Sequence, residues 1–358
     1  MTSCYVHIPF CQSICSYCDF FRIKDNGPMR KQWLEVIQKE IAAASVGRVD
    51  TLYFGGGTPS LLTGEEFNQL AGAFSLHPDA EFTVECNPES VDMQKLQTYR
   101  KAGVNRISLG VQTMDDALLK RIGRNHTSRQ ALQAMDRIRQ AGLDNLSVDL
   151  IFALPDQSFR QVRHDVETVL AAKIPHLSIY SLQIEENSVF GKQKLEPIDP
   201  QKEEEMYEWI VRRMKEAGYQ HYEISSFALP GYESKHNLVY WSDADFYGFG
   251  PGASGRLHTD RYDHTGTVSS YIKDGPQIRW IEETVSEKGF NAIMMGLRTQ
   301  YGVDIRAWNQ KYRTDCLEKY KEVIRKYDQL YVRDHHLICT EEGRAILNTI
   351  LVDFLEVD

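Results

Sequence analysis

Apolar and polar residues alternate in blocks along the first 230 residues, and the pattern predicts strands separated by helices. Seven short apolar runs are typical of strands buried on both faces. They cover residues 4–8, 51–54, 81–85, 106–111, 146–152, 176–183 and 219–225. Longer amphipathic stretches lie between them, for example at residues 32–44, 128–140 and 159–171. Repeated strand–helix units predict an α/β fold with a parallel sheet, either open or closed into a barrel, and leave six and eight strands as alternatives.

The alternation ends near Pro230, which predicts a different organisation for the rest of the chain. Residues 235–255 are rich in glycine and aromatic side chains, as is typical of a functional loop. A helix at 282–298, two helices at 305–312 and 317–326, a hairpin at 330–339 and a last helix capped by Thr340 follow. This order predicts a winged-helix-like module. We therefore expect a core at 1–230, a connecting segment at 231–281 and a C-terminal domain at 282–358.

Composition narrows the classes of function. The 358 residues are 42% hydrophobic and 25% charged, as in ordinary globular proteins. The net charge of −9 argues against nucleic acid as a partner, because binding a phosphate backbone needs a basic face. We recognise no signal peptide and no apolar run long enough to span a membrane. With seven cysteines, which fit a reducing compartment, these features predict a cytoplasmic protein.

Three of the cysteines are the most informative residues of the chain. Cys11, Cys15 and Cys18 have the spacing C-x3-C-x2-C. Full ligation of a cubic [4Fe–4S] cluster takes four thiolates, so a loop with three leaves one iron for a ligand that is not protein. This spacing resembles the signature of the radical S-adenosylmethionine (SAM) superfamily, which implies that SAM occupies the open iron. A zinc site that includes His7 and a disulfide are the alternatives.

The four other cysteines have simpler expected fates. Cys316 and Cys339 fit buried apolar thiols, and Cys4 and Cys86 fit core positions or positions just behind the site. None of the four is predicted to ligate the cluster.

Polar residues also follow several of the predicted strands, where parallel architectures gather their sites. The turn Gly55-Gly-Gly-Thr-Pro59 follows the second strand and resembles the segment that holds the SAM amino group in this superfamily. Glu85 and Asp149, on the third and fifth strands, can accept hydrogen bonds from ribose hydroxyls. Gln112 offers a donor and an acceptor. Arg124 can contact the SAM carboxylate.

The motifs Y-x-H-I-P-F-C-x3-C-x2-C, G-G-G-T-P, V-E-x-N-P-E, G-V-Q and D-L-I-x-x-L-P together resemble the oxygen-independent coproporphyrinogen III oxidase family, over essentially the whole chain. The resemblance implies a partial (β/α)6 barrel, with Cys11, Cys15 and Cys18 holding the cluster. It also implies a SAM site lined by Tyr5, Tyr17, Gly56, Gly57, Thr58, Glu85, Gln112, Arg124 and Asp149.

Two departures indicate a sister branch of that family. The oxidases carry a fourth cysteine two residues after the third, where this chain has Phe20, and an N-terminal arm for which Tyr5 leaves no room. The segment from His236 to Trp241 matches the H-N-x-x-Y-W motif of the HemW group of haem-binding proteins. The resemblance implies haem binding by His236, Asn237, Tyr240 and Trp241. Imidazole is a good axial ligand, and the two aromatic rings offer flat apolar faces.

The expected function is therefore that of a haem chaperone, which binds haem as cargo and delivers it to an acceptor protein. In this interpretation the cluster and SAM serve a structural, dimerising or gating role. The main alternative is a true coproporphyrinogen III oxidase, which removes two propionate carboxyl groups by radical chemistry. A radical SAM enzyme with another substrate is the third alternative.

Overall fold

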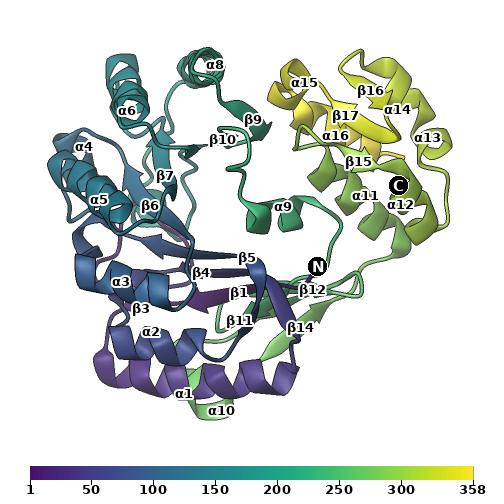
Figure 1. Cartoon of the computed structure of the whole chain (residues 1–358). Helices are drawn as coiled ribbons and strands as arrows, with labels where there is room; N and C mark the ends of the chain where they lie inside the picture. The colour runs from purple at the N-terminus through teal and green to yellow at the C-terminus, as the bar shows by residue number, and fades with distance from the viewer. Residues whose placement is uncertain (358) are drawn as a thin grey trace.

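The computed structural model describes residues 1–357, and its largest element is a nine-stranded sheet with helices along its outer side (Figure 1). The strand order is β11-β1-β4-β5-β6-β7-β8-β10-β9, and all neighbours from β11 to β8 are parallel. The parallel strands are β1 (Ser3–Ile8), β4 (Arg48–Gly56), β5 (Ser75–Cys86), β6 (Arg106–Gln112), β7 (Asn145–Phe152), β8 (His176–Ser181) and β11 (Tyr247–Phe249). Six of them confirm the predicted strand–helix alternation.

The helices of the core begin where the sequence supplies capping residues. In α5 (Ser128–Gln140) and α6 (Phe159–Ala171), Thr127 and Ser158 accept hydrogen bonds from the backbone three residues on, and a glutamine reaches back to close a capping box. The other core helices are α1 (Gly27–Ala44), α2 (Gly64–Ala71), α3 (Met93–Lys101), α4 (Asp116–Arg121), α7 (Val189–Lys192) and α8 (Pro200–Glu216).

Each strand buries apolar residues toward the helices and turns polar residues inward. In β6, Ile107 and Leu109 belong to the main hydrophobic core, whereas Arg106 and Ser108 line an interior cavity. Successive side chains of a strand point to opposite faces, so this alternation gives the curved sheet an apolar outside and a polar inside. The fold is the expected α/β arrangement, a sheet that leaves one side open.

The structure departs from the sequence predictions at three places. The apolar run at 219–225 gives two antiparallel edge strands, β9 (Gln220–Glu223) and β10 (Ser226–Ala228), because two residues between them allow only a reversal of the chain. The expected loop at 235–255 contains helix α9 (Lys235–Trp241) and the parallel strand β11. A separate three-stranded sheet follows, with β12 (Ser254–Leu257), β13 (Asp260–His264) and β14 (Ile278–Ile281); helix α10 (Val268–Asp274) connects the last two strands and packs against α1.

The C-terminal residues form a second hydrophobic core around Trp308, Tyr320 and Phe354. Its small sheet, in the order β15-β17-β16, packs with helices in the way the winged-helix-like prediction requires, and Thr340 caps α15 as predicted. The elements are α11 (Val285–Gly296), β15 (Val303–Asp304), α12 (Ile305–Tyr312), α13 (Cys316–Lys319), α14 (Lys321–Lys326), β16 (Leu330–Arg333), β17 (His336–Cys339), α15 (Glu341–Ala345) and α16 (Leu347–Leu355). Helix α11 packs against α9, which lies between this part and the sheet (Figure 1). Among residues 1–357, no helix combines the length and the apolar character that crossing a membrane requires.

Candidate functional site: two adjoining cavities

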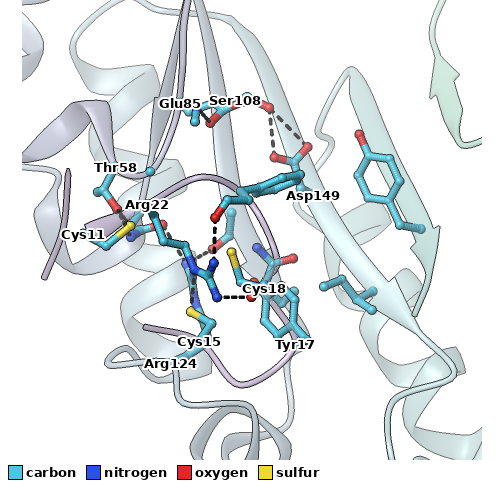
Figure 2. Close-up of a pocket in the computed structure, with 18 of the residues that line it drawn as sticks. Cys11, Cys15, Tyr17, Cys18, Arg22, Thr58, Glu85, Ser108, Arg124 and Asp149 are labelled. Atoms are coloured by element: carbon cyan, nitrogen blue, oxygen red, sulfur yellow. Dashed lines mark hydrogen bonds between the residues drawn. The ribbon is translucent and has the colours of Figure 1, made fainter. Parts of the chain in front are cut away.

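The cysteine loop crosses the open end of the sheet between two short strands, β2 (Phe10–Cys11) and β3 (Ile23–Lys24). Backbone hydrogen bonds hold it on both sides: Ser16 N–H donates to Ile122 O over 2.9 Å, and Phe190 N–H donates to Ser16 O over 3.0 Å. Cys11, Cys15 and Cys18 all line one cavity of about 350 Å³. The sequence therefore folds so that three thiols separated by turns face a common space (Figure 2).

Two groups donate hydrogen bonds to these sulfur atoms. The Thr58 hydroxyl donates to Cys11 Sγ over 3.6 Å, and Arg124 Nη1 donates to Cys15 Sγ over 3.8 Å. Burial raises the pKa of Cys11 and raises that of Cys18 to about 11, with the Arg22 guanidinium opposing both shifts. The ligating form of cysteine is the thiolate, so cluster binding here releases protons. The donor set fits a thiolate-bound iron–sulfur cluster, whose sulfur atoms accept hydrogen bonds.

The two alternatives for the cysteines find no support in the described residues. His7 is buried, with Nε2 2.6 Å from Phe21 O and Nδ1 3.0 Å from the Tyr5 hydroxyl. Burial lowers the pKa of His7 to about 4, and the imidazole does not line the cavity. Between residues 1 and 357, no three His, Cys, Asp or Glu side chains are grouped for a single metal ion, and all seven cysteines are free thiols. A cubic cluster has separate iron atoms and accepts thiolates that are spread more widely than a zinc site allows.

The glycine turn lies beneath the cysteine loop. Gly56 has a φ of +105°, a backbone conformation that residues with a side chain rarely adopt. A Cβ atom on Gly57 would lie 2.8 Å from the carbonyl oxygens of Ile8 and Phe10. The need for glycine at these two positions therefore comes from the close approach of the turn to the first strand. This packing brings the Thr58 hydroxyl to Cys11.

Carboxylates occupy the opposite side of the first cavity, where Figure 2 places Glu85, Ser108 and Asp149. Glu85 accepts hydrogen bonds from the Tyr53 hydroxyl over 2.9 Å and from Gly56 N–H over 3.1 Å, and burial raises its pKa to about 7. The Ser108 hydroxyl lies 3.0 Å and 3.1 Å from the two oxygens of Asp149, whose pKa burial also raises. These carboxyl groups can accept further hydrogen bonds from a ligand.

Arg124 and Gln112 complete the first cavity between the cysteines and the carboxylates. Arg124 Nη2 donates to Asn87 Oδ1 over 2.8 Å and to Gly110 O over 2.5 Å, which fixes the guanidinium in the wall. Gln112 has φ +70° and follows a shift in register between β6 and β7. Such an irregularity re-aims a side chain at the end of a strand, and Gln112 lines the cavity.

The predicted site residues divide between two cavities. Eleven of the twelve residues predicted for the cluster and SAM lie on the first cavity; they are Cys11, Cys15, Tyr17, Cys18, Gly56, Gly57, Thr58, Glu85, Gln112, Arg124 and Asp149. Tyr5 instead lines a second cavity of about 360 Å³. This second cavity also includes Asn237, Tyr240 and Trp241, and it shares walls with the first at Tyr53, Glu85, Tyr180 and Asn237.

His236 lines neither cavity. It is fully buried, its Nδ1 lies 2.8 Å from the Thr51 hydroxyl, and its Nε2 lies 2.7 Å from the Tyr240 hydroxyl. Its ring stacks on that of Tyr53 with the centroids 5.0 Å apart, and burial lowers its pKa to about 3. The imidazole is therefore neutral with both nitrogens hydrogen-bonded, and Tyr240 stands between it and the second cavity.

Several residues of the site were not predicted from the sequence. They include Arg22, Tyr53, Asn87, Arg106, Ser108 and Tyr180, all of which line the first cavity. Two of them could have been predicted. Tyr53 and Ser108 lie on the inward face of strands whose C-terminal residues on the same face are predicted to belong to the site. Arg106 could not have been predicted, because it begins β6, away from the strand end where sites are sought.

Comparison with known proteins agrees with this arrangement. The family model of the radical SAM superfamily matches residues 5–169, and that of the HemN C-terminal domain matches residues 284–346. The fold and the cysteine-lined cavity thus define a radical SAM protein with a HemN-type C-terminal domain.

Full-length relatives narrow the family. Heme chaperone HemW of Lactococcus lactis is 38% identical, over 99% of this chain and 97% of the relative, and heme chaperone HemW of Escherichia coli is 38% identical, over 99% and 98%. The chain belongs to the HemW family. Coproporphyrinogen III oxidase HemN from Escherichia coli shares the fold with a TM-score of 0.85 at 20% identity, covering 99% of this chain and 89% of that one.

Proposed function

We propose that this protein is a haem chaperone, which binds haem and transfers it to an acceptor protein. The observation that carries the proposal is the pair of adjoining cavities, one lined by cysteines and carboxylates and the other by the aromatic residues of the predicted haem motif. Relatives named heme chaperones match nearly the whole chain, which supports the same function here. The likeness to HemN concerns the fold alone.

We propose further that Cys11, Cys15 and Cys18 hold a [4Fe–4S] cluster and that SAM binds beside it. When bound, these cofactors supply one-electron chemistry. The chain's own part is to bind and orient them. Thr58 and Arg124 stabilise the negative charge of two thiolates by donating to their sulfur atoms. Glu85 and Asp149 would accept hydrogen bonds from ribose hydroxyls, and Tyr17, Gly56, Gly57 and Gln112 would complete the contacts, whereas Tyr5 lines the second cavity and is not assigned to SAM.

For haem, the proposal assigns direct contacts to Asn237, Tyr240 and Trp241, which line the second cavity. Tyr and Trp offer flat surfaces that suit a porphyrin. His236 can ligate iron only if its hydrogen bond to Tyr240 breaks, because both of its nitrogens are engaged. We therefore propose that haem binding displaces the Tyr240 ring and frees Nε2 of His236.

The three predicted segments fit a division of labour. In our proposal, residues 1–230 carry the cluster and SAM, residues 231–281 supply the haem motif, and residues 282–358 cover it from the other side. The free state of all seven cysteines supports a cytoplasmic location. The partners would be haem, an acceptor protein and, in a dimer, a second copy of this chain.

The test is a pair of measurements on anaerobically reconstituted protein. Haem is titrated first, and the protein is then given SAM, a reductant and coproporphyrinogen III, with an authentic oxidase as control. We expect stoichiometric haem uptake and no decarboxylated product. Turnover at the rate of the control would replace the chaperone by the oxidase, the alternative that the sequence motifs also suggest.

A further inference from the structure

Arg298 has a partly buried guanidinium with no hydrogen-bond partner among the described residues, and burial lowers its pKa by more than the attraction of Glu223 raises it. It follows α11 at the edge of the C-terminal domain and lines the second cavity. Its Nε is buried without a hydrogen bond, and among residues 1–357 its guanidinium takes part in no hydrogen bond or ion pair. A partly buried guanidinium loses hydration, and that cost is recovered only when an anion or a set of acceptors is supplied.

The position of Arg298 is fixed by its neighbours. Thr299 forms an antiparallel bridge with Glu223, and Gln300 N–H donates to Tyr222 O over 2.9 Å. Two backbone contacts next to Arg298 thus tie the C-terminal domain to the edge strand β9. These contacts fix the backbone from which the Arg298 side chain extends, which reduces the backbone entropy lost when a ligand binds.

The other residues that line the second cavity indicate the shape and chemistry of its ligand. Tyr5, Tyr180, Tyr240 and Trp241 give it aromatic faces, and its volume of about 360 Å³ is at the small end of the range of about 300–1,000 Å³ for ligand sites. It therefore suits one edge of a large flat molecule better than the whole of it. A flat aromatic molecule with an acidic group at its edge satisfies both the rings and the guanidinium.

The anion is a carboxylate in preference to a phosphate. Glu223 is buried and lines the same cavity, and the charge of Arg298 is the only cationic one in the lining. One guanidinium carries a single positive charge, so a dianionic phosphate beside Glu223 would leave a larger excess of negative charge in this part-buried space than a carboxylate would. Guanidinium and carboxylate also match each other as a two-bonded pair.

We propose that Arg298 binds a propionate carboxylate of the tetrapyrrole, so that the C-terminal domain holds the acidic edge of haem while Tyr240 and Trp241 contact its face. The inference rests on the proposed function and adds a residue and a chemical group to it. Haem carries propionates on one edge, which matches a cavity that accepts an edge. The carboxylate of SAM is the second source of the same chemistry.

The test compares two ligands in three proteins. Ferric haem and its dimethyl ester, in which both propionates are blocked, are titrated into the cluster-loaded wild type, Arg298→Gln and Arg325→Gln. Arg325 is an exposed residue of the same domain that lines neither cavity, so it controls for the loss of a positive charge. SAM affinity is measured in parallel.

We expect Arg298→Gln to weaken haem binding about 10-fold to 100-fold, the range typical of a charge-assisted hydrogen bond, and to leave binding of the diester unchanged. Arg325→Gln should bind both ligands like the wild type. Arg298→Lys keeps the positive charge and should therefore keep part of the preference for haem over the diester. This variant separates the loss of charge from a defect in folding.

The outcomes separate the two proposals. Equal weakening for haem and diester would mean that Arg298 only supports the domain contact, and unchanged haem binding would remove it from the site; either result overturns the inference. A loss confined to SAM affinity would assign the carboxylate to SAM and overturn it as well. A wild type that binds neither haem nor the diester contradicts the proposed function itself.

Discussion

The two cavities share four residues but are built on different principles. In the first, Glu85 is hydrogen-bonded to Tyr53 and Gly56, Asp149 to Ser108, and Arg124 to Asn87 and Gly110, whereas the buried Nε atoms of Arg106 and Arg124 have no hydrogen-bond partner. In the second, aromatic rings surround a guanidinium that has no partner. The two carboxylates and Arg124 of the first cavity are held in place before a ligand binds, which suits a resident cofactor. A wall with an unsatisfied charge suits a cargo that arrives and leaves.

The largest effect that tests this comparison is the loss of a loop cysteine. Cys15→Ala should abolish cluster assembly, because two thiolates leave the cubic cluster without its third anchor. Iron and sulfide content after reconstitution checks the expectation. Cys86→Ala is the matched control, since Cys86 lines the same cavity but is not predicted to be a ligand. Normal iron content in Cys15→Ala, or a loss in Cys86→Ala, would contradict the ligand set.

The next effect concerns Glu85, on the wall between the cavities. Its pKa is raised from 4.5 to about 7 in the folded protein, so the native state binds this proton more tightly than the unfolded chain does. The favourable contribution is complete below pH 4.5 and is lost as the pH rises through 7. Since water in the cavity offsets part of the burial, we expect wild type to lose about 1–3 kcal/mol relative to Glu85→Gln between pH 4.5 and pH 8.

Denaturant unfolding of both proteins at the two pH values, without SAM, measures this difference. Any constant cost of losing the bond from Tyr53 or Gly56 cancels, because only the change with pH is compared. A gap in stability that stays constant across this range would mean that Glu85 has an ordinary pKa. Burial of the Glu85 carboxylate would then cost little, and a hydrogen bond from a ribose hydroxyl would have no such cost to offset.

A third, smaller effect examines the haem motif behind the second cavity. His236→Ala removes the partner of the Tyr240 hydroxyl and the ring stacked on Tyr53, and we expect haem retention to fall about tenfold with cluster content unchanged. Thr51→Val is the control: it removes the partner of Nδ1 and leaves the imidazole in place. Equal haem affinity in wild type and His236→Ala would refute a role for His236. A changed absorption band of bound haem in His236→Ala alone would identify it as the axial ligand.

The sequence predicts the first cavity far better than the second, for a physical reason. Cys11, Glu85 and Asp149 lie at or near strand ends, and parallel strands bring such ends together whatever the details of packing. Tyr5, Glu223 and Arg298 come from the first strand, an edge strand and the C-terminal domain, and only the assembled fold makes them neighbours. No motif or residue spacing in the sequence predicts that these three residues are neighbours.

The same distinction explains the haem motif. The sequence predicts that the residues from His236 to Trp241 belong to a loop, in which each side chain would be free to contact a ligand. The structure forms helix α9 there, with Ser234 as its cap, and helical geometry places His236 and Tyr240 on the same face, where His236 is buried behind the Tyr240 ring that lines the cavity. The local pattern groups these residues in one segment, whereas burial decides which of their side chains reaches a cavity.

The smallest effect concerns the fine tuning of the first cavity. Thr58→Val keeps the shape of the side chain and removes the hydroxyl that donates to Cys11 Sγ over 3.6 Å. Hydrogen bonds to cluster sulfurs favour the reduced, more negative state, so their loss lowers the reduction potential. A bond of about 0.5–1.5 kcal/mol corresponds to about 20–60 mV for one electron. Anaerobic redox titration should find this drop with iron content unchanged, and a potential equal to that of wild type would mean that Thr58 serves only to pack the turn against the cysteine loop.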